Sequence, residues 1–305
     1  MERCKCGRRA VFFRRYEGTY LCDRHFTYSI EKKVKRNIRV NRLIRSGDRI
    51  GIAVSGGKDS MSLLHIMNEI LGPRRDIDFL AITIDEGIRP YREKGIRYAK
   101  EYCKKLGIEH HIYSFKDIFG KSLDEKMKEF ENPESGLSCT LCGVGRRYIL
   151  NKVARELGLN KLCLGHNLDD EAQAIIMNYI RGDLFRASRM GPKPVVYDKK
   201  FVGRIKPMRI IPEEEIKLYA TLKGIKFQEK NCPYKSGIRL EVREFLNKLE
   251  ENHPGIKFII LETFDRLLPY IRQCVKNHQE KVTYCKFCGE PSSKDVCKTC
   301  VLWRE

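Results

Sequence analysis

The hexapeptide Ser55–Ser60, with the sequence SGGKDS, constrains the fold of this chain more than any other stretch. It follows the apolar run 50–54 and precedes an apolar-periodic segment at 61–71, a pattern that predicts a strand turning into a helix. Two glycines let the backbone approach a ligand closely, and the start of a helix directs N–H groups and partial positive charge at one place. The hexapeptide therefore predicts a phosphate-binding loop.

Two common nucleotide loops do not fit this stretch. A Walker loop requires glycine where Ile52 stands and serine or threonine where Asp59 stands, and a Rossmann fingerprint requires a third glycine. The polar residues still suit a nucleotide, because Ser55 and Ser60 can donate hydroxyls, Lys58 supplies charge and Asp59 can hold Mg²⁺. The alternative is a tight turn with solvated polar residues.

An alternation of strand and helix patterns surrounds this loop. Such alternation predicts an α/β fold, Rossmann-like, with a parallel sheet and helices on both faces. The expected strands are 50–54, 79–85, 109–114, 161–167 and 202–208, and the expected helices are 61–71, 92–106, 169–180, 213–223, 242–250 and 256–275.

Ligands of parallel sheets lie beyond the carboxyl ends of the strands. Ala53 and Val54, Ile84 and Gly165 all fall at predicted strand ends, so we expect their loops to frame one nucleotide. Three acids follow Gly165 at residues 169–171, on the first turn of a predicted helix, where acids are also ordinary N-terminal caps. Opposite a phosphate loop, Asp169 or Asp170 can instead position Mg²⁺.

Clusters of soft ligands stand at both ends of the chain. They are Cys4, Cys6, Cys22 and His25 near the start, and Cys285, Cys288, Cys297 and Cys300 near the end. Close pairs separated by a short turn favour two tetrahedral zinc sites, Cys3His and Cys4, because segments this short cannot fold around a core of their own. We therefore expect a zinc module at 1–30, a catalytic domain at 31–280 and a second zinc module at 281–305.

Lysine and arginine number 60 against 40 acidic residues, which gives a formal net charge of +20. A surplus this large predicts a polyanionic partner, either nucleic acid or an anionic membrane surface. No apolar run is long enough to span a bilayer, and the polar start Met1–Lys5 is not a signal peptide. We expect a soluble, cytoplasmic protein that faces nucleic acid. The basic stretch 29–45 is either a solvated helix face or a contact for phosphates.

Three further cysteines lie within the expected catalytic domain. Cys139 and Cys142 form a Cys-x-x-Cys pair, and the next candidate ligand is Cys232. Such a pair alone is compatible with zinc, a redox couple or an iron–sulfur cluster. Three thiolates are one fewer than a closed zinc site needs, so the set suits a metal centre that keeps an open position for chemistry.

The loop Ser55–Ser60, the thiols of Cys139, Cys142 and Cys232, and the segment Gly165–Asp170 together resemble the tRNA 2-thiolation branch of the PP-loop ATPases. These enzymes split ATP into AMP and pyrophosphate. The resemblance implies ATP and Mg²⁺ at the loop, and a [4Fe–4S] cluster on the three cysteines.

This likeness covers residues 48–235, and the paired zinc modules extend it to nearly the whole chain. The modules resemble the enzymes that thiolate T-loop 5-methyluridine rather than those that thiolate cytidine. The resemblance implies tRNA as the substrate, a homodimer, and as sulfur donor either sulfide or a ubiquitin-like carrier with a C-terminal thiocarboxylate. The implied catalytic residues are Lys58, Asp59, Asp170 and Arg146, the last standing where some relatives carry lysine.

The thiolation reaction is chemically reasonable without reference to the family. The C2 carbonyl of a pyrimidine is a poor electrophile, so its oxygen first attacks ATP and becomes an adenylate, which releases pyrophosphate. Sulfur then displaces AMP. Three alternatives remain: thiolation of another base, such as cytidine or a wobble uridine; nitrogen transfer of the lysidine type, which would not need the three cysteines; and a non-catalytic zinc-finger RNA-binding protein, which leaves Ser55–Ser60 unexplained.

Overall fold

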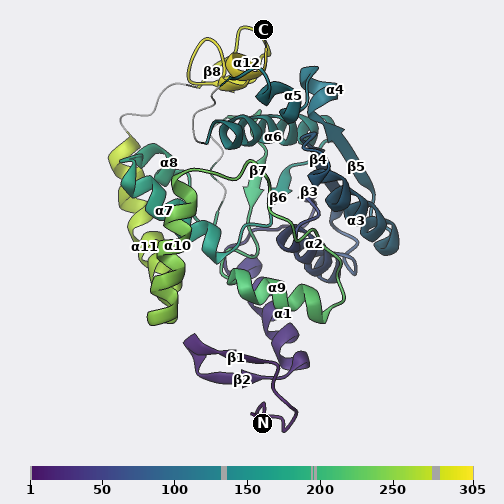
Figure 1. Ribbon diagram of the computed structural model, residues 1–305, viewed down its shortest axis with the longest axis vertical. Helices are drawn as coiled ribbons and strands as arrows, with labels where there is room; N and C mark the ends of the chain where they lie inside the picture. Colours follow the sequence, from purple (N-terminus) through teal and green to yellow (C-terminus); the bar gives the residue numbers. More distant parts are fainter. Residues whose placement is uncertain (1, 132–135, 194, 196–197, 277–281, 305) are drawn as a thin grey trace.

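The computed structural model describes residues 2–131, 136–193, 195, 198–276 and 282–304 (Figure 1). Its centre is a parallel sheet of five strands in the order β5-β4-β3-β6-β7. The strands are β3 (Arg49–Ala53), β4 (Asp78–Asp85), β5 (His110–Ser114), β6 (Lys161–Cys163) and β7 (Gly203–Ile205). From β3 the chain passes outward to β4 and β5, then returns to β6 on the other side. The order therefore reverses between β3 and β6, where sheets of this kind bind their ligands.

Helices cover both faces of the sheet, which confirms the predicted fold class. Because side chains alternate along a strand, Ala81 of β4 joins one apolar cluster and Ile82 the other. The first cluster unites the sheet with α1 (Asp23–Val40), α2 (Lys58–Leu71), α3 (Tyr91–Leu106) and α9 (Glu213–Leu222). The second unites it with α4 (Phe115–Phe119), α5 (Leu123–Met127), α6 (Leu137–Glu156) and α12 (Lys298–Trp303).

A separate group of helices flanks the sheet on the β7 side (Figure 1). It comprises α7 (Leu168–Ile180), α8 (Leu184–Ser188), α10 (Ile238–Asn252) and α11 (Ile256–Lys276). Leu261, Phe264 and Leu268 of α11 are buried against Leu168 and Ile175 of α7. Of the helices predicted after Pro212, α9 therefore packs on the core as expected, whereas α10 and α11 pack on α7 and α8.

The main errors of the sequence prediction are short elements. Helices α4, α5 and α8 have five residues each, too few to show a periodic pattern, and were not predicted. The strand expected at 161–167 ends at Cys163, because Asn167 is already the N-cap of α7. The strand expected at 202–208 spans only Gly203–Ile205, because the chain turns where Arg209 N donates to Lys206 O.

The two terminal modules lie at opposite ends of the molecule (Figure 1). The first contains β1 (Phe12–Arg14), the 3-10 turn η1 (Arg15–Glu17) and β2 (Thr19–Leu21); the second contains β8 (Thr283–Tyr284) and β9 (Pro291–Ser292). In each module the four predicted ligand atoms lie within 4.8 Å of one another, as a single metal ion requires; these are the atoms of Cys4, Cys6, Cys22 and His25, and of Cys285, Cys288, Cys297 and Cys300.

One of the two expected domain limits falls inside a helix, and the other lies outside the described residues. The limit at residue 30 falls inside α1, which runs without a break from the first module into the core. The limit at residue 281 lies outside the described residues. Within the basic stretch, Ile30, Val34 and Ile38 are buried on the core, while most of its lysines and arginines face solvent. Among the described helices, none is both long enough and apolar enough to cross a membrane.

A buried ion pair joins the first module to the core. Arg14 of β1 and Glu215 of α9 are 2% and 0% exposed, and two guanidinium nitrogens of Arg14 donate to the carboxylate at 3.1 and 2.6 Å. The hydroxyl of Tyr16 donates to the same carboxylate. Such a pair resists the loss of one partner, because the remaining charge stays buried.

We expect Glu215→Ala to lower the free energy of unfolding by about 3 kcal/mol, because the Arg14 guanidinium loses its counter-charge in a site closed to water. Chemical denaturation followed by circular dichroism measures the change. The control is Arg74→Ala, which breaks a pair with Asp76 whose side chains are 39% and 42% exposed and should leave stability nearly unchanged. Equal effects of the two substitutions would show that the Arg14–Glu215 pair does not anchor the module.

Candidate functional site

The predicted phosphate loop connects β3 to α2 in a rigid turn. Gly56 has φ +81°, and a Cβ there would meet the carbonyl oxygen of Gly95 at 2.1 Å, so only glycine fits. The Ser60 hydroxyl accepts from the Ser55 amide at 3.1 Å and donates to the Gly57 carbonyl at 3.0 Å. The loop is therefore held in shape by its own side chains.

Two residues from distant segments fasten the loop to its surroundings. Arg92 of α3 donates to the carbonyls of Ser55 at 2.7 Å and Ile84 at 2.8 Å, which links the ends of β3 and β4. The amide of Gln228 donates to the Gly56 carbonyl at 2.8 Å. These contacts fix the loop from both sides.

Lys58 and Asp59, at the start of α2, form a charged cluster with Glu213 of α9. The ammonium of Lys58 lies 2.8 Å from Asp59 and 2.7 Å from Glu213. Burial lowers the pKa of Lys58, but the two carboxylates outweigh it and the net pKa is raised. Burial raises the pKa of Asp59 despite the neighbouring ammonium. Lys58 therefore carries a proton and a full charge at the loop.

The end of β6 faces this cluster. Asn167 accepts from the Asp170 amide at 2.9 Å as N-cap of α7, and its own amide group donates to Asp59 at 2.9 Å. A Cβ on Gly165 would approach the backbone of Asp59 and Ser60 to 3.2 Å, so the two strand ends pack tightly. One side chain, Asn167, thus sets the distance between the two predicted acidic residues.

The two candidate acids of α7 have different surroundings. Asp169 is 6% exposed, accepts from Lys257 at 2.5 Å and from the Glu213 amide at 2.8 Å, and does not line the cavity of the site. Asp170 lines that cavity and pairs with Arg239 at 3.0 Å, and burial raises its pKa. Asp169 therefore joins α7 to α9 and α11, and Asp170 is the acid placed to meet a ligand.

A cavity of about 1630 Å³ extends from the loop to α6. The predicted site residues that line it are Ala53, Val54, Ser55, Asp59, Ser60, Ile84, Arg146, Gly165 and Asp170. Gly56, Gly57 and Lys58 belong to the same loop and the start of α2 but are not among the lining residues. Its basic lining residues include Arg147, Arg186, Arg189, Arg204, Lys206 and Arg239. The cavity is large enough for ATP together with a second substrate, and its lining suits anions.

Two of the three core cysteines lie on a helix that lines this cavity, although none of the three thiols is itself a lining residue. Cys139 and Cys142 lie on the first turns of α6, whose Gly143 and Arg146 line it. The Cys139 thiol lies 3.6 Å from the Tyr234 carbonyl, two residues beyond Cys232. Burial raises the pKa of Cys142 to about 11, although the guanidinium of Arg146 opposes the shift. A thiol this basic binds metal only by losing its proton to it.

The spacing of the three core thiols indicates which metal centre they could bind. Among the described residues, the compact groups whose ligand atoms all lie within 4.8 Å are the terminal ones, so the three core thiols are spread more widely than ligands of one zinc ion. A four-iron cluster is larger than a single ion and needs such spacing. Three thiols spaced in this way therefore fit an iron–sulfur cluster with three protein ligands better than a single zinc ion.

Several residues of the site were not singled out from the sequence. Asn167 could have been recognised, since asparagine three residues before an acid at a helix start is a capping pattern. Arg92, Glu213 and Gln228 carry no local signal, because the fold alone brings them to the loop. Glu86, 3% exposed, also lines the cavity and lies 3.6 Å from Arg146.

Comparison with known proteins places this geometry in a family. The PP-loop domain model matches residues 25–248, and the model described as 2-thiouridine synthetase TtuA, N-terminal LIM domain, matches residues 3–27. The first covers most of the chain and includes the phosphate loop. The second coincides with the Cys3His module.

Curated relatives and one solved structure match nearly the full length. The tRNA 2-thiolation protein NcsA of Haloferax volcanii is 38% identical over 99% of this chain and 98% of its own, and a tRNA-5-methyluridine(54) 2-sulfurtransferase of Pyrococcus horikoshii is 34% identical over 99% and 93%. The structure of the U34-tRNA thiolase NcsA from Methanococcus maripaludis with its [4Fe-4S] cluster has 36% identity and a TM-score of 0.83 over 98% of this chain and 94% of that one. The chain therefore belongs to the PP-loop family, in the branch of the tRNA 2-thiolation proteins.

Proposed function

We propose that this protein is an ATP-dependent tRNA 2-sulfurtransferase that converts a uridine into 2-thiouridine. The observation that carries the proposal is the shared cavity, which has the phosphate loop at one end and the helix of Cys139 and Cys142 at the other. A nitrogen-transfer enzyme of the same family needs no thiols there, and a binding protein needs no phosphate loop. The relatives named for tRNA thiolation support the same reading.

The first step activates the base. The C2 oxygen of the uridine attacks the α-phosphorus of ATP, the bond to the β-phosphate breaks, and pyrophosphate leaves. The loop backbone, the hydroxyls of Ser55 and Ser60, and Lys58 bind the phosphates, so that Lys58 exchanges its carboxylate partners for them. Asp59 and Asp170 would hold a Mg²⁺ ion, which would supply positive charge to stabilise the leaving pyrophosphate.

The second step replaces oxygen by sulfur. Hydrosulfide attacks C2 of the adenylated base, and AMP leaves with the original oxygen. Cys139, Cys142 and Cys232 would hold a [4Fe–4S] cluster, which would supply a binding position for that sulfur. Arg146 lines the cavity, acts electrostatically on the Cys142 thiol, and stabilises the negative charge of the departing AMP. Arginine cannot exchange its proton readily, so it acts here as a fixed cation.

The target base and the sulfur donor are finer parts of the proposal. We propose a T-loop 5-methyluridine, in line with the Pyrococcus relative, and sulfide or a ubiquitin-like thiocarboxylate carrier as donor. The second candidate target is the wobble uridine, favoured by the name of the Methanococcus enzyme with TM-score 0.83. Mass spectrometry of nucleosides from tRNA treated with protein, ATP and sulfide tests the activity, and sequencing of the thiolated fragment assigns the base.

The proposal also covers the compartment, the domain roles and the oligomeric state of the enzyme. We propose that it acts in the cytoplasm, as the name of the Xenopus laevis relative, cytoplasmic tRNA 2-thiolation protein 1, suggests. The divisions 1–30, 31–280 and 281–305 serve as zinc module, catalytic domain and zinc module. The homodimer stays a prediction, to be tested by light scattering.

Cys232→Ser is expected to lose the iron–sulfur cluster and thiolation together while ATP still binds, because the phosphate loop lies on a separate turn. Iron and acid-labile sulfide analysis of anaerobically purified protein, with ATP binding by calorimetry, measures both. Cys274→Ser, an exposed cysteine of α11, is the matched control and should change neither. Thiolation by Cys232→Ser at the wild-type rate would end the cluster assignment.

Lys58→Ala is expected to lower the thiolation rate at least 100-fold, because the phosphates lose a charged donor at the site of bond breaking. Affinity for tRNA should remain within about twofold of wild type, since Lys58 lies at the nucleotide loop. Lys104→Ala, an exposed lysine of α3, controls for the charge change. Gel-shift and single-turnover assays measure the two quantities; a parallel loss of tRNA affinity would make the loop a structural element.

Cys285→Ser is expected to release one of two zinc ions and to weaken tRNA binding, because the second module depends on its metal to fold. Zinc analysis by mass spectrometry and a binding titration report the outcome. Retention of both zinc ions, or iron in place of zinc in this module, would contradict the assignment.

A further inference from the structure

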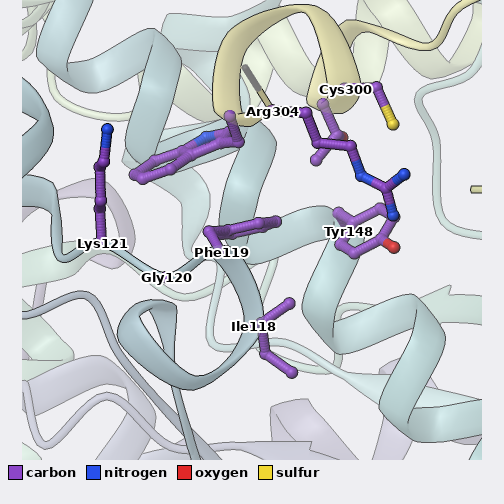
Figure 2. Close-up of a pocket in the computed structure, with 9 residues that line it drawn as sticks. Ile118, Phe119, Gly120, Lys121, Tyr148, Cys300 and Arg304 are labelled. Atoms are coloured by element: carbon purple, nitrogen blue, oxygen red, sulfur yellow. The ribbon is translucent and has the colours of Figure 1, made fainter. Parts of the chain in front are cut away.

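A second cavity, of about 350 Å³, lies where the C-terminal module meets the core (Figure 2). Its walls come from the end of α4 and the two residues after it, from Tyr148 in α6, and from one side of α12 with the residue that follows it. The lining residues of this cavity are all absent from the lining of the large one. The proposed reaction therefore gives this second cavity no task.

Aromatic rings form the walls of this second cavity. The ring of Phe119 lies 4.7 Å from that of Trp303, nearly parallel to it, and 5.8 Å from that of Tyr148. Figure 2 shows Phe119 between Lys121 and Tyr148, with Arg304 extending toward Tyr148. Flat rings at a small cavity are the surface on which unpaired nucleobases stack, with little regard for base identity.

The charged residues at this cavity are cationic. Lys121 and Arg304 line it beside Cys300, a member of the C-terminal ligand group, and among the described residues no aspartate or glutamate lines it. Lys121 pairs with Glu129 at 2.8 Å, so part of its charge is compensated. Arg304 is exposed and donates to the Phe287 carbonyl at 3.2 Å; no carboxylate of the described residues lies within ion-pair distance of it. A guanidinium so placed suits a phosphate.

We infer that this cavity binds an unpaired nucleotide of the tRNA, with its base against Tyr148 and Phe119 and its phosphate against Arg304. This inference rests on the proposed function for the identity of the RNA. A volume of about 350 Å³ admits one nucleotide and excludes a duplex. The net charge of +20 and the cationic rim favour an RNA over an acidic or apolar protein segment. The C-terminal module thereby holds tRNA at a point remote from the reacting base.

Tryptophan fluorescence can report whether this second cavity is occupied. Trp303 is the only tryptophan of the chain and lines the cavity, so its emission senses an occupant. A single-stranded octamer of uridine is expected to quench that emission saturably. A blunt RNA duplex is expected not to, because its bases are already stacked. Equal quenching by both would overturn the inference.

Two substitutions test the contacts. Tyr148→Leu keeps apolar volume but removes the stacking ring, and should weaken binding of a tRNA transcript about tenfold. Arg304→Ala should weaken binding several-fold and reduce its dependence on salt. Lys298→Ala is the matched control, since it removes an exposed charge from helix α12 outside the cavity. Its affinity for the tRNA transcript should stay closer to that of the wild type than the affinities of the other two variants.

The outcomes separate this inference from the proposed function. At saturating tRNA both variants should thiolate at the wild-type maximal rate, because neither residue lines the large cavity. Wild-type affinity for tRNA in both variants would overturn the inference that this second cavity binds a nucleotide, and would leave the proposed enzyme activity unaffected. A slower rate only when a carrier protein supplies sulfur, with RNA affinity unchanged, would also overturn it and identify the cavity as a protein contact. Zinc content and thermal melting verify folding; should Tyr148→Leu melt early, Arg304→Ala and the octamer titration decide alone.

Discussion

The close approach of backbone at Gly56 is the constraint on which the rest of the structure depends. The turn can form only because Gly56 lacks a side chain where Gly95 of α3 crosses it. Once formed, it is fastened by Ser60 from within and by Arg92 and Gln228 from outside. A loop fixed in this way offers phosphate groups a preorganised site, and fixed donors stabilise developing charge without reorganising during the reaction.

The first turn of α9 connects this loop to distant parts of the molecule. Glu213 pairs with Lys58 at the loop and with Arg243 of α10, and its amide donates to Asp169 of α7. Two residues later, Glu215 receives the buried guanidinium of Arg14 from the first zinc module. One short acidic segment thus joins the nucleotide site, the flanking helices and a terminal module. In the proposed reaction Lys58 leaves Glu213 to reach the phosphates, so binding of ATP would disturb this segment.

The sequence predicts the parts of this protein that local pattern determines. The strand–loop–helix at Ser55–Ser60, the two terminal ligand groups and the parallel sheet follow from glycine placement, cysteine spacing and apolar periodicity. The sequence alone could not distinguish the role of Asp169 from that of Asp170, since both lie in the first turn of the same helix. The difference arises from Lys257, which lies 88 residues further on and neutralises Asp169. Likewise, only the folded sheet brings Glu213 to Lys58 across 155 residues.

The central claim is that the uridine oxygen attacks ATP before sulfur arrives, within one cavity lined by the phosphate loop and by the helix that carries Cys139 and Cys142. The most direct test is to thiolate tRNA whose target uridine carries ¹⁸O at C2, and to analyse the released nucleotide by mass spectrometry. The account predicts one ¹⁸O atom in AMP for each thiouridine formed, and none in pyrophosphate. Recovery of the label in water or pyrophosphate, with unlabelled AMP, would contradict it.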